Sequence, residues 1–99
     1  GALRAALGDR VSALIDEGVE VVEDRVRQIE TAEPLAGDEA ARLAHEIGGV
    51  SGQIGLKRLS GEALALERLC RDGEETEARA AAAALARTAR ASVEAARTM

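Results

Sequence analysis

Apolar residues recur every three or four positions along most of the chain, and this spacing predicts amphipathic helices. The first long helix is predicted from about Asp9 to Thr31. Its apolar stripe consists of Val11, Ile15, Val19, Val22, Val26 and Ile29. We expect residues 2–7 to form a short separate helix ahead of it, because Gly8 can end one helix and Asp9 can cap the next.

A segment at 33–37 that contains proline and glycine interrupts this pattern and is predicted to be a connection. Asp38 has the side chain of a helix N-cap, and another stretch with helical spacing follows it. The second helix is therefore predicted from about 39 to 54. Gly55 is expected to end this helix, because glycine readily takes the left-handed conformation found at helix C-termini.

Two further helices are predicted, from about 56 to 71 and from about 74 to 97, and Asp72-Gly73 is expected to end the first of them. The buried stripe of the third helix is predicted to be Leu59, Ala63, Leu66 and Cys70. That of the fourth helix is predicted to be Ala81, Leu85, Thr88, Ser92 and Ala95, with Val93 alongside. Small side chains bury little apolar area, so we expect the fourth helix to be the least stable element.

Residues 1–99 are predicted to form a single all-α domain. The chain contains no Phe, Tyr or Trp and only one Pro, while Ala, Leu, Glu and Arg dominate, and this composition favours helix over sheet. Four amphipathic helices with short connections predict an antiparallel up-and-down four-helix bundle, here with a short additional N-terminal helix. Such a bundle by itself indicates no function.

Composition argues against several classes of function. The 13 basic and 18 acidic residues give a net charge of −5 and are interspersed, so no nucleic-acid partner is expected. No apolar run approaches the roughly 20 residues that cross a bilayer, and no secretory signal is recognisable, so we expect no membrane insertion and a cytoplasmic location. A single His and a single Cys do not supply a metal site. Cys70 lies in an apolar stripe, which favours a buried structural thiol.

The second predicted helix has an apolar stripe of Leu43, Ile47, Val50 and Ile54. The histidine lies on the opposite side of this helix, so His45 is expected to be exposed. Its neighbours on that face are Ala41, Arg42, Gly48, Gly49 and Gly52. A glycine inside a helix costs about 1 kcal/mol relative to alanine, so the three glycines lower the local helix preference by roughly 2–3 kcal/mol. Either a ligand or another backbone approaches this face closely, or the segment is a glycine-rich loop between two helices.

The residues around the histidine resemble the signature of a known family. The pattern Ala44-His45-x-x-Gly48-Gly49-x-Ser51-x-x-x-Gly55, followed by Leu59 and Leu66-Glu67, is similar to that of histidine phosphotransfer (Hpt) domains. These domains are four-helix bundles with an exposed active histidine on the second bundle helix, and nearly the whole chain fits this order. The resemblance implies that His45 is the phosphoryl acceptor and that Gly49 leaves room for the partner's active site.

Glu67 corresponds to a position where the family often has a Gln or Glu that hydrogen-bonds the active imidazole. A carboxylate there can accept a hydrogen bond from one ring nitrogen and leave the other as nucleophile. The resemblance therefore implies that Glu67 orients the imidazole of His45. The alternative for Glu67 is an ordinary solvated carboxylate on a helix surface.

One position departs from the family pattern. Three residues after the histidine the family usually has a lysine, and this chain has Gly48. Arg42, Lys57 or Arg58 could supply positive charge instead, although each could also be an ordinary surface residue. We expect the partner to dock on a surface that comprises Ala41, Arg42, Gly48, Gly49, Gly52, Lys57 and Arg58.

The function that the resemblance implies is phosphorelay histidine phosphotransfer, in which His45 carries a phosphoryl group between receiver-domain aspartates of response regulators. The expected partners are these receiver domains and a sensor histidine kinase. Nothing in the chain resembles a nucleotide-binding loop or a carboxylate Mg²⁺ site. We therefore expect a phosphocarrier that is not a self-sufficient kinase and has no cofactor of its own, with Mg²⁺ on the receiver.

Two other readings of the sequence stay open. The first is a degenerate Hpt-like or scaffolding helical bundle that binds protein partners without phosphoryl transfer. The second is an enzyme that uses His45 as a general base, although the sequence shows no nucleophile or oxyanion partner for it. Retained partner binding after loss of His45 would distinguish the scaffold from the carrier.

Overall fold

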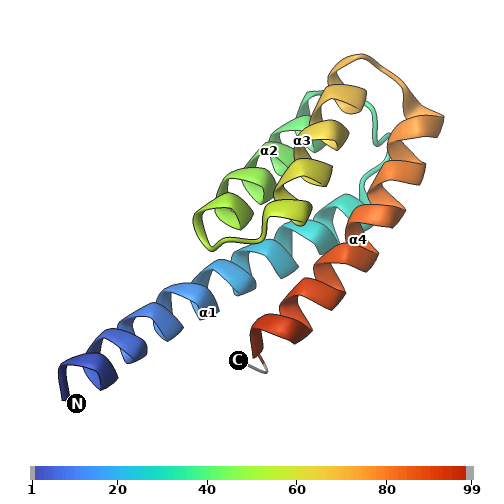
Figure 1. Ribbon diagram of the computed structural model, residues 1–99. Helices are drawn as coiled ribbons and strands as arrows, with labels where there is room; N and C mark the ends of the chain where they lie inside the picture. Colours follow the sequence, from blue (N-terminus) through green and yellow to red (C-terminus); the bar gives the residue numbers. More distant parts are fainter. Residues whose placement is uncertain (1, 98–99) are drawn as a thin grey trace.

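The computed structural model describes the backbone of residues 2–97 and the side chains of residues 8–95. Its helices are α1 (Ala2–Thr31), α2 (Asp38–Gln53), α3 (Lys57–Arg71) and α4 (Glu75–Arg97), with no strand in the described residues. Each helix runs opposite to the one before it, and the four lie side by side in an elongated bundle (Figure 1). The predicted all-α four-helix bundle is confirmed.

The core combines large side chains from all four helices with several small alanine side chains of α4. Ile29, Ile47, Leu59, Leu66 and Leu85 are each at most 1% exposed. The predicted stripe of α3 is confirmed, since all four of its members are buried. The helices α2 and α3 make the most extensive contact of any pair, and α1 and α4 make the least extensive of the contacting pairs.

The buried face of α4 differs from the prediction. Its buried residues are Ala78, Ala82, Leu85, Ala86, Ala89 and Val93. Of the other residues predicted for this stripe, Ala81, Thr88 and Ser92 are only half-buried and Ala95 is exposed. Alanine occurs on every side of this helix, so the apolar pattern does not distinguish one face from another.

The helix α1 continues without a break through Gly8, so the predicted separate N-terminal helix is wrong. One glycine weakens a helix by about 1 kcal/mol but does not have to end it. The N-terminal half of α1 extends beyond the other three helices (Figure 1), and the molecule measures 52 × 19 × 19 Å. Val11 was expected in the core but is 54% exposed, because no other helix reaches that part of α1.

Two of the predicted glycine turns are confirmed. Gly55 and Gly73 have φ values of +84° and +75°, in the region that favours glycine. After α2, the Leu56 amide donates to the Ser51 carbonyl at 2.8 Å, and the Gly55 amide donates to the carbonyl three residues before it. Two equivalent bonds end α3: the Glu74 amide donates to the Leu69 carbonyl at 3.0 Å, and the Gly73 amide donates to the carbonyl three residues before it. Both helices therefore end in a Schellman motif, which satisfies their last carbonyl groups.

The start of α2 lies one residue earlier than predicted. Gly37 occupies the N-cap position, where no side-chain cap forms, and Asp38 lies in the first turn. The predicted N-cap role of Asp38 is therefore wrong, although its negative charge still suits the helix N-terminus. Gly37 has a φ of +147° and donates its amide to the Cys70 carbonyl at 3.0 Å, which attaches the connection to α3.

Candidate functional site

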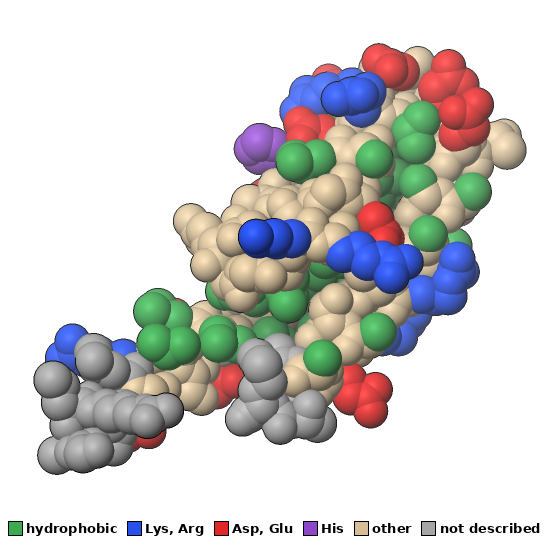
Figure 2. Space-filling view, in the orientation of Figure 1, with side chains coloured by type: hydrophobic (Ala, Val, Ile, Leu, Met, Phe, Trp, Pro, Cys, Tyr) green, Lys and Arg blue, Asp and Glu red, His purple; other side chains and the backbone are tan. Residues whose placement is uncertain are grey.

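The glycine-rich segment around the histidine is helical, because α2 runs from Asp38 to Gln53 without interruption. The alternative of a loop between two helices is therefore wrong. The His45 side chain is 68% exposed, as expected. It projects from the surface of the bundle (Figure 2). An external group can thus reach the ring without any movement of the helices.

The exposed ring is hydrogen-bonded on one side. Nδ1 of His45 lies 3.0 Å from Oε1 of Glu67, which comes from the neighbouring helix α3 and is 15% exposed. A carboxylate can only accept hydrogen bonds, so the proton of the neutral ring lies on Nδ1. The lone pair of the ring is then on Nε2. The structure thus brings together the two residues that the resemblance paired.

A second residue holds Glu67 from the other side. Arg71, one turn further along α3, donates from Nη2 to Oε2 of Glu67 at 2.7 Å and from Nε at 3.0 Å. The hydrogen bond from Arg71 is the main cause that lowers the pKa of Glu67, burial opposes it, and the bond with His45 adds to the lowering. The carboxyl is therefore ionised at neutral pH. The sequence analysis missed Arg71. The spacing could have indicated this bond, because a glutamate four residues before an arginine on one helix can pair with it.

The glycines of α2 differ in what surrounds them. A Cβ on Gly49 would meet nothing within 4 Å, so this residue leaves bare backbone beside the histidine. A Cβ on Gly48 would lie 3.1 Å from Cδ2 of Leu64, and one on Gly52 would lie 3.4 Å from Oγ of Ser60. Gly48 and Gly52 therefore allow α3 to approach closely, and Gly49 leaves the surface open.

Two residues of the predicted docking surface are not accessible. Ala41 is 0% exposed, and Gly48 is also buried. Each lies about a turn from His45 along α2, on the flank of the exposed face, and neighbouring helices cover these flanks. Their expected place on the accessible surface is therefore wrong. Gly49 and Gly52 are exposed, as expected.

The predicted cations around the histidine are exposed, but two of them are already paired. Arg42 bonds Glu39 at 2.8 Å and also bonds Glu46 on its own helix. Arg58 donates to a glutamate one turn later on α3 at 3.0 Å. Lys57 is exposed at the start of α3. None of these pairs involves His45 or its hydrogen-bond partner.

An apolar side chain beside the site was also missed. Leu64 is 48% exposed and lies against Gly48, one turn from the histidine. In the sequence Leu64 falls outside the apolar stripe of α3. An apolar residue away from the buried face could have indicated an exposed apolar group near the site. Leu64 thus partly fills the space beside Gly48, the position where the family usually has a lysine.

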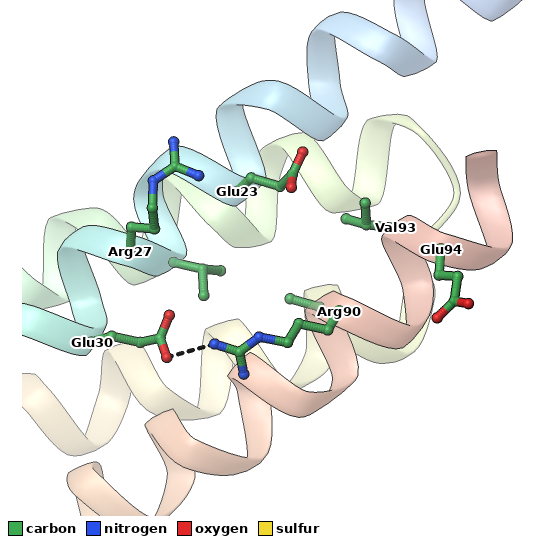
Figure 3. A pocket seen from close by; sticks show the side chains of 8 residues that line it. Glu23, Arg27, Glu30, Arg90, Val93 and Glu94 are labelled. Atoms are coloured by element: carbon green, nitrogen blue, oxygen red, sulfur yellow. Dashed lines mark hydrogen bonds and ion pairs between the residues drawn. The ribbon is translucent and has the colours of Figure 1, made fainter.

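A groove of about 570 Å³ lies between α1 and α4 and is separate from the histidine site. Val26, Ala89 and Val93 form its apolar part, and Arg90 pairs with Glu30 across it at 2.8 Å (Figure 3). Its lining comes from the helix pair that makes the least extensive contact and includes no residue of α2 or α3. The groove therefore contributes nothing to the chemistry at His45.

The remaining candidate chemistry is sparse. Cys70 is 1% exposed, and burial, with a smaller contribution from the charge of Glu75, raises the pKa of its thiol. The predicted buried thiol is confirmed. Within the described residues, no cluster of three or more His, Cys, Asp or Glu side chains could hold a metal ion. No helix there is long and apolar enough to span a membrane.

Comparison with protein families agrees with this site. The family model of the Hpt domain matches residues 9–98. The chain belongs to the Hpt family. Hpt domains act in histidine phosphotransfer in phosphorelays, as phosphocarriers and not as kinases, and they interact with response-regulator receivers and with kinases. No curated protein and no solved structure matches this Hpt domain.

Proposed function

We propose that this Hpt domain carries a phosphoryl group on Nε2 of His45 between aspartates of response-regulator receiver domains. The observation that supports this most is the bond from Nδ1 to Glu67. This bond leaves Nε2 as the unprotonated nitrogen of an exposed ring, and such a nitrogen is a nucleophile. A sensor histidine kinase is a further proposed partner.

In the proposed reaction, the lone pair of Nε2 attacks the phosphorus of an aspartyl phosphate on the receiver. The N–P bond forms while the P–O bond to the aspartate breaks, and the aspartate leaves as a carboxylate. The Nδ1 proton stays in its bond to Glu67, whose negative charge stabilises the positive charge that the ring gains. The reverse reaction loads a second receiver.

Phosphoryl transfer needs mainly positioning and neutralisation of charge. This chain supplies the positioned nucleophile, and we assign Mg²⁺ to the receiver, so the domain is proposed to need no cofactor of its own. Arg42, Lys57 and Arg58 are the proposed sources of positive charge at the edge of the site. Each of these cations lies on α2 or α3, the two helices that form the site.

The proposed docking surface is the accessible area around His45. Gly49 and Gly52 present backbone with no side chain, and Leu64 adds an exposed apolar group. A helix of a receiver could approach the bare backbone closely and contact the leucine. This surface replaces the broader one expected from the sequence, since Ala41 and Gly48 are buried.

A second candidate function is an Hpt-like bundle, degenerate or scaffolding, that binds protein partners without accepting phosphate. The residue three positions after the histidine favours this candidate, because Gly48 carries no charge and Leu64 covers it. Binding alone would require the docking surface but not the free Nε2.

The two candidates differ in what happens to labelled phosphate. Receiver domains phosphorylated with labelled acetyl phosphate would be mixed with the wild-type protein and with His45→Ala, after circular dichroism shows both to be folded. We expect acid-labile, alkali-stable label on the wild type, no label on the variant, and receiver binding by both. Binding by the wild type without any transfer of label from a panel of receivers would favour the second candidate.

A further inference from the structure

We propose that Arg71 is a positioning residue for His45, which acts by holding the Glu67 carboxylate against the ring. This inference rests on the proposed function, in which Nε2 of His45 is the nucleophile. Neither the resemblance to Hpt domains nor the family match gives Arg71 a role.

The geometry is a chain of three side chains on two helices. Arg71 bonds Oε2 of Glu67 through both Nη2 and Nε, at 2.7 and 3.0 Å, while Oε1 of the same carboxylate faces Nδ1 of His45 at 3.0 Å. Each oxygen of the carboxylate thus has its own partner. Two donors of one planar guanidinium on a single oxygen restrict rotation of the carboxylate.

Glu67 needs such a restraint because its side chain has three rotatable bonds. Without Arg71, Oε2 would lose both of its bonds, and the carboxylate could rotate away from the histidine or turn Oε2 toward water. Burial to 15% exposure also disfavours the ionised form of this carboxyl, and the Arg71 bond is the main opposing influence on its pKa. Arg71 thus keeps Glu67 both ionised and correctly turned.

On α2, no cation near His45 is bonded to Glu67 in the part of the chain that the structure describes. Gly48 on α2 offers no side chain, and Leu64 occupies the space beside it. Arg42 bonds Glu39 and Glu46. Arg71 is therefore the cation that is bonded to the partner of His45, and it also offsets the negative charge of Glu67 near an incoming phosphoryl group.

In the proposed reaction, the proton on Nδ1 of His45 does not move. With Glu67 fixed, the ring proton stays on Nδ1 throughout transfer, and no proton leaves when the N–P bond forms. If Arg71 is lost, the ring should spend more time with its proton on Nε2. In that tautomer Nε2 has no lone pair to attack phosphorus.

The experiment compares Arg71→Gln with a matched control, Arg79→Gln, after circular dichroism shows both variants to be folded. Arg79 also pairs with a glutamate four residues before it, at 2.6 Å, but it lies on α4, and that glutamate bonds the backbone of the connection between α1 and α2 instead of His45. The first readout is the pair of ring ¹⁵N chemical shifts of His45 in the unphosphorylated protein, which report the tautomer. His45 is the single histidine, so these signals are unambiguous. The second readout is the rate of label uptake from a phosphorylated receiver.

We expect Arg71→Gln to lower the Nδ1–H population and to slow uptake on the order of tenfold, by analogy with the loss seen when the hydrogen-bond partners of metal-binding histidines are removed. Arg79→Gln should change neither quantity, and Arg71→Lys should restore part of both. In a Glu67→Ala background, Arg71→Gln should have no further effect, because the residue through which it acts is gone.

Unchanged tautomer populations in Arg71→Gln would overturn the inference, and so would slower uptake without a tautomer shift. Either result would leave the proposed function intact if the wild type still accepts label. Failure of the wild type to accept label would instead overturn the proposed function. The tautomer measurement would still decide whether Arg71 positions Glu67, since it needs no phosphate.

Discussion

Single residues on α2 decide which part of the site is open. Gly48, Gly49 and Gly52 look alike in the sequence, yet only Gly49 combines exposure with empty space where a Cβ would lie. The other two lie against Leu64 and Ser60 of α3. A side chain at position 49 would therefore not disturb the bundle but would stand beside His45, where the partner is proposed to approach.

The change Gly49→Leu is expected to reduce phosphoryl transfer about a hundredfold or more, because a branched side chain would hold the receiver away from Nε2. Helical content by circular dichroism should stay near that of the wild type. The matched control is Gly8→Leu, since Gly8 is also an exposed helical glycine with nothing near its Cβ position, on the extended part of α1. Equal transfer rates for wild type and Gly49→Leu would refute the steric argument.

At the scale of the elements, a side chain from α4 organises the connection between α1 and α2. The carboxylate of Glu75 accepts hydrogen bonds from the backbone amides of Leu35 and Ala36, at 3.1 and 2.6 Å. These bonds lower the pKa of Glu75, most strongly through Ala36, and Arg79 adds to the effect. The connection is therefore attached to the first turn of α4 by charge-assisted hydrogen bonds.

This attachment predicts a pH dependence of stability. A carboxyl whose pKa is lowered from 4.5 on folding stabilises the folded state above that pH, and the stabilisation is lost as the pH falls through the lowered value. Glu75→Gln should therefore melt at a lower temperature than the wild type at pH 7, and the difference should shrink below about pH 4. The exposed neighbour Glu74 provides the control, and Glu74→Gln should melt like the wild type. A difference between Glu75→Gln and wild type that stayed constant down to pH 3 would contradict this account.

At the scale of the whole molecule, the site lies on the seam between α2 and α3, the two helices in most extensive contact. Gly48 and Gly52 permit the close approach, and Ser60 Oγ donates to the Gly48 carbonyl at 2.8 Å across this seam. His45 and Glu67 come from different helices, so their distance depends on that packing. This packing places the nucleophile beside its hydrogen-bond partner before a receiver arrives.

The sequence predicted those parts of the fold that depend on the spacing of apolar residues and on the backbone conformation of glycine at helix ends. The ends of α2 and α3 at Gly55 and Gly73 follow from glycine conformation, and the α3 stripe follows from its large apolar residues. The buried face of α4 could not be predicted, because alanine lies on all of its sides. The low stability expected for α4 stays a prediction. Gly8 was mistaken for a helix end, since one glycine can equally continue a helix.

The site was predictable to the extent that it depends on helical position. The exposure of His45 and the contact with Glu67 were both expected, the second through the resemblance. Burial of Ala41 depends on how far neighbouring helices cover the flanks of α2, which periodicity does not show. The bond from Arg71 to Glu67 has the spacing of an ordinary surface pair on a helix, and only the position of His45 beside it makes it notable.

The most direct test of the central claim is the position of the phosphoryl group on the transferred product. The wild-type protein, labelled with ¹⁵N in its one histidine, would be loaded by a receiver domain that carries an aspartyl phosphate and then measured by ³¹P and ¹⁵N NMR. We expect a single N–P bond at Nε2 of His45, with the proton on Nδ1 still directed at Glu67. Phosphorus bonded to Nδ1, or to any other residue, would contradict the account.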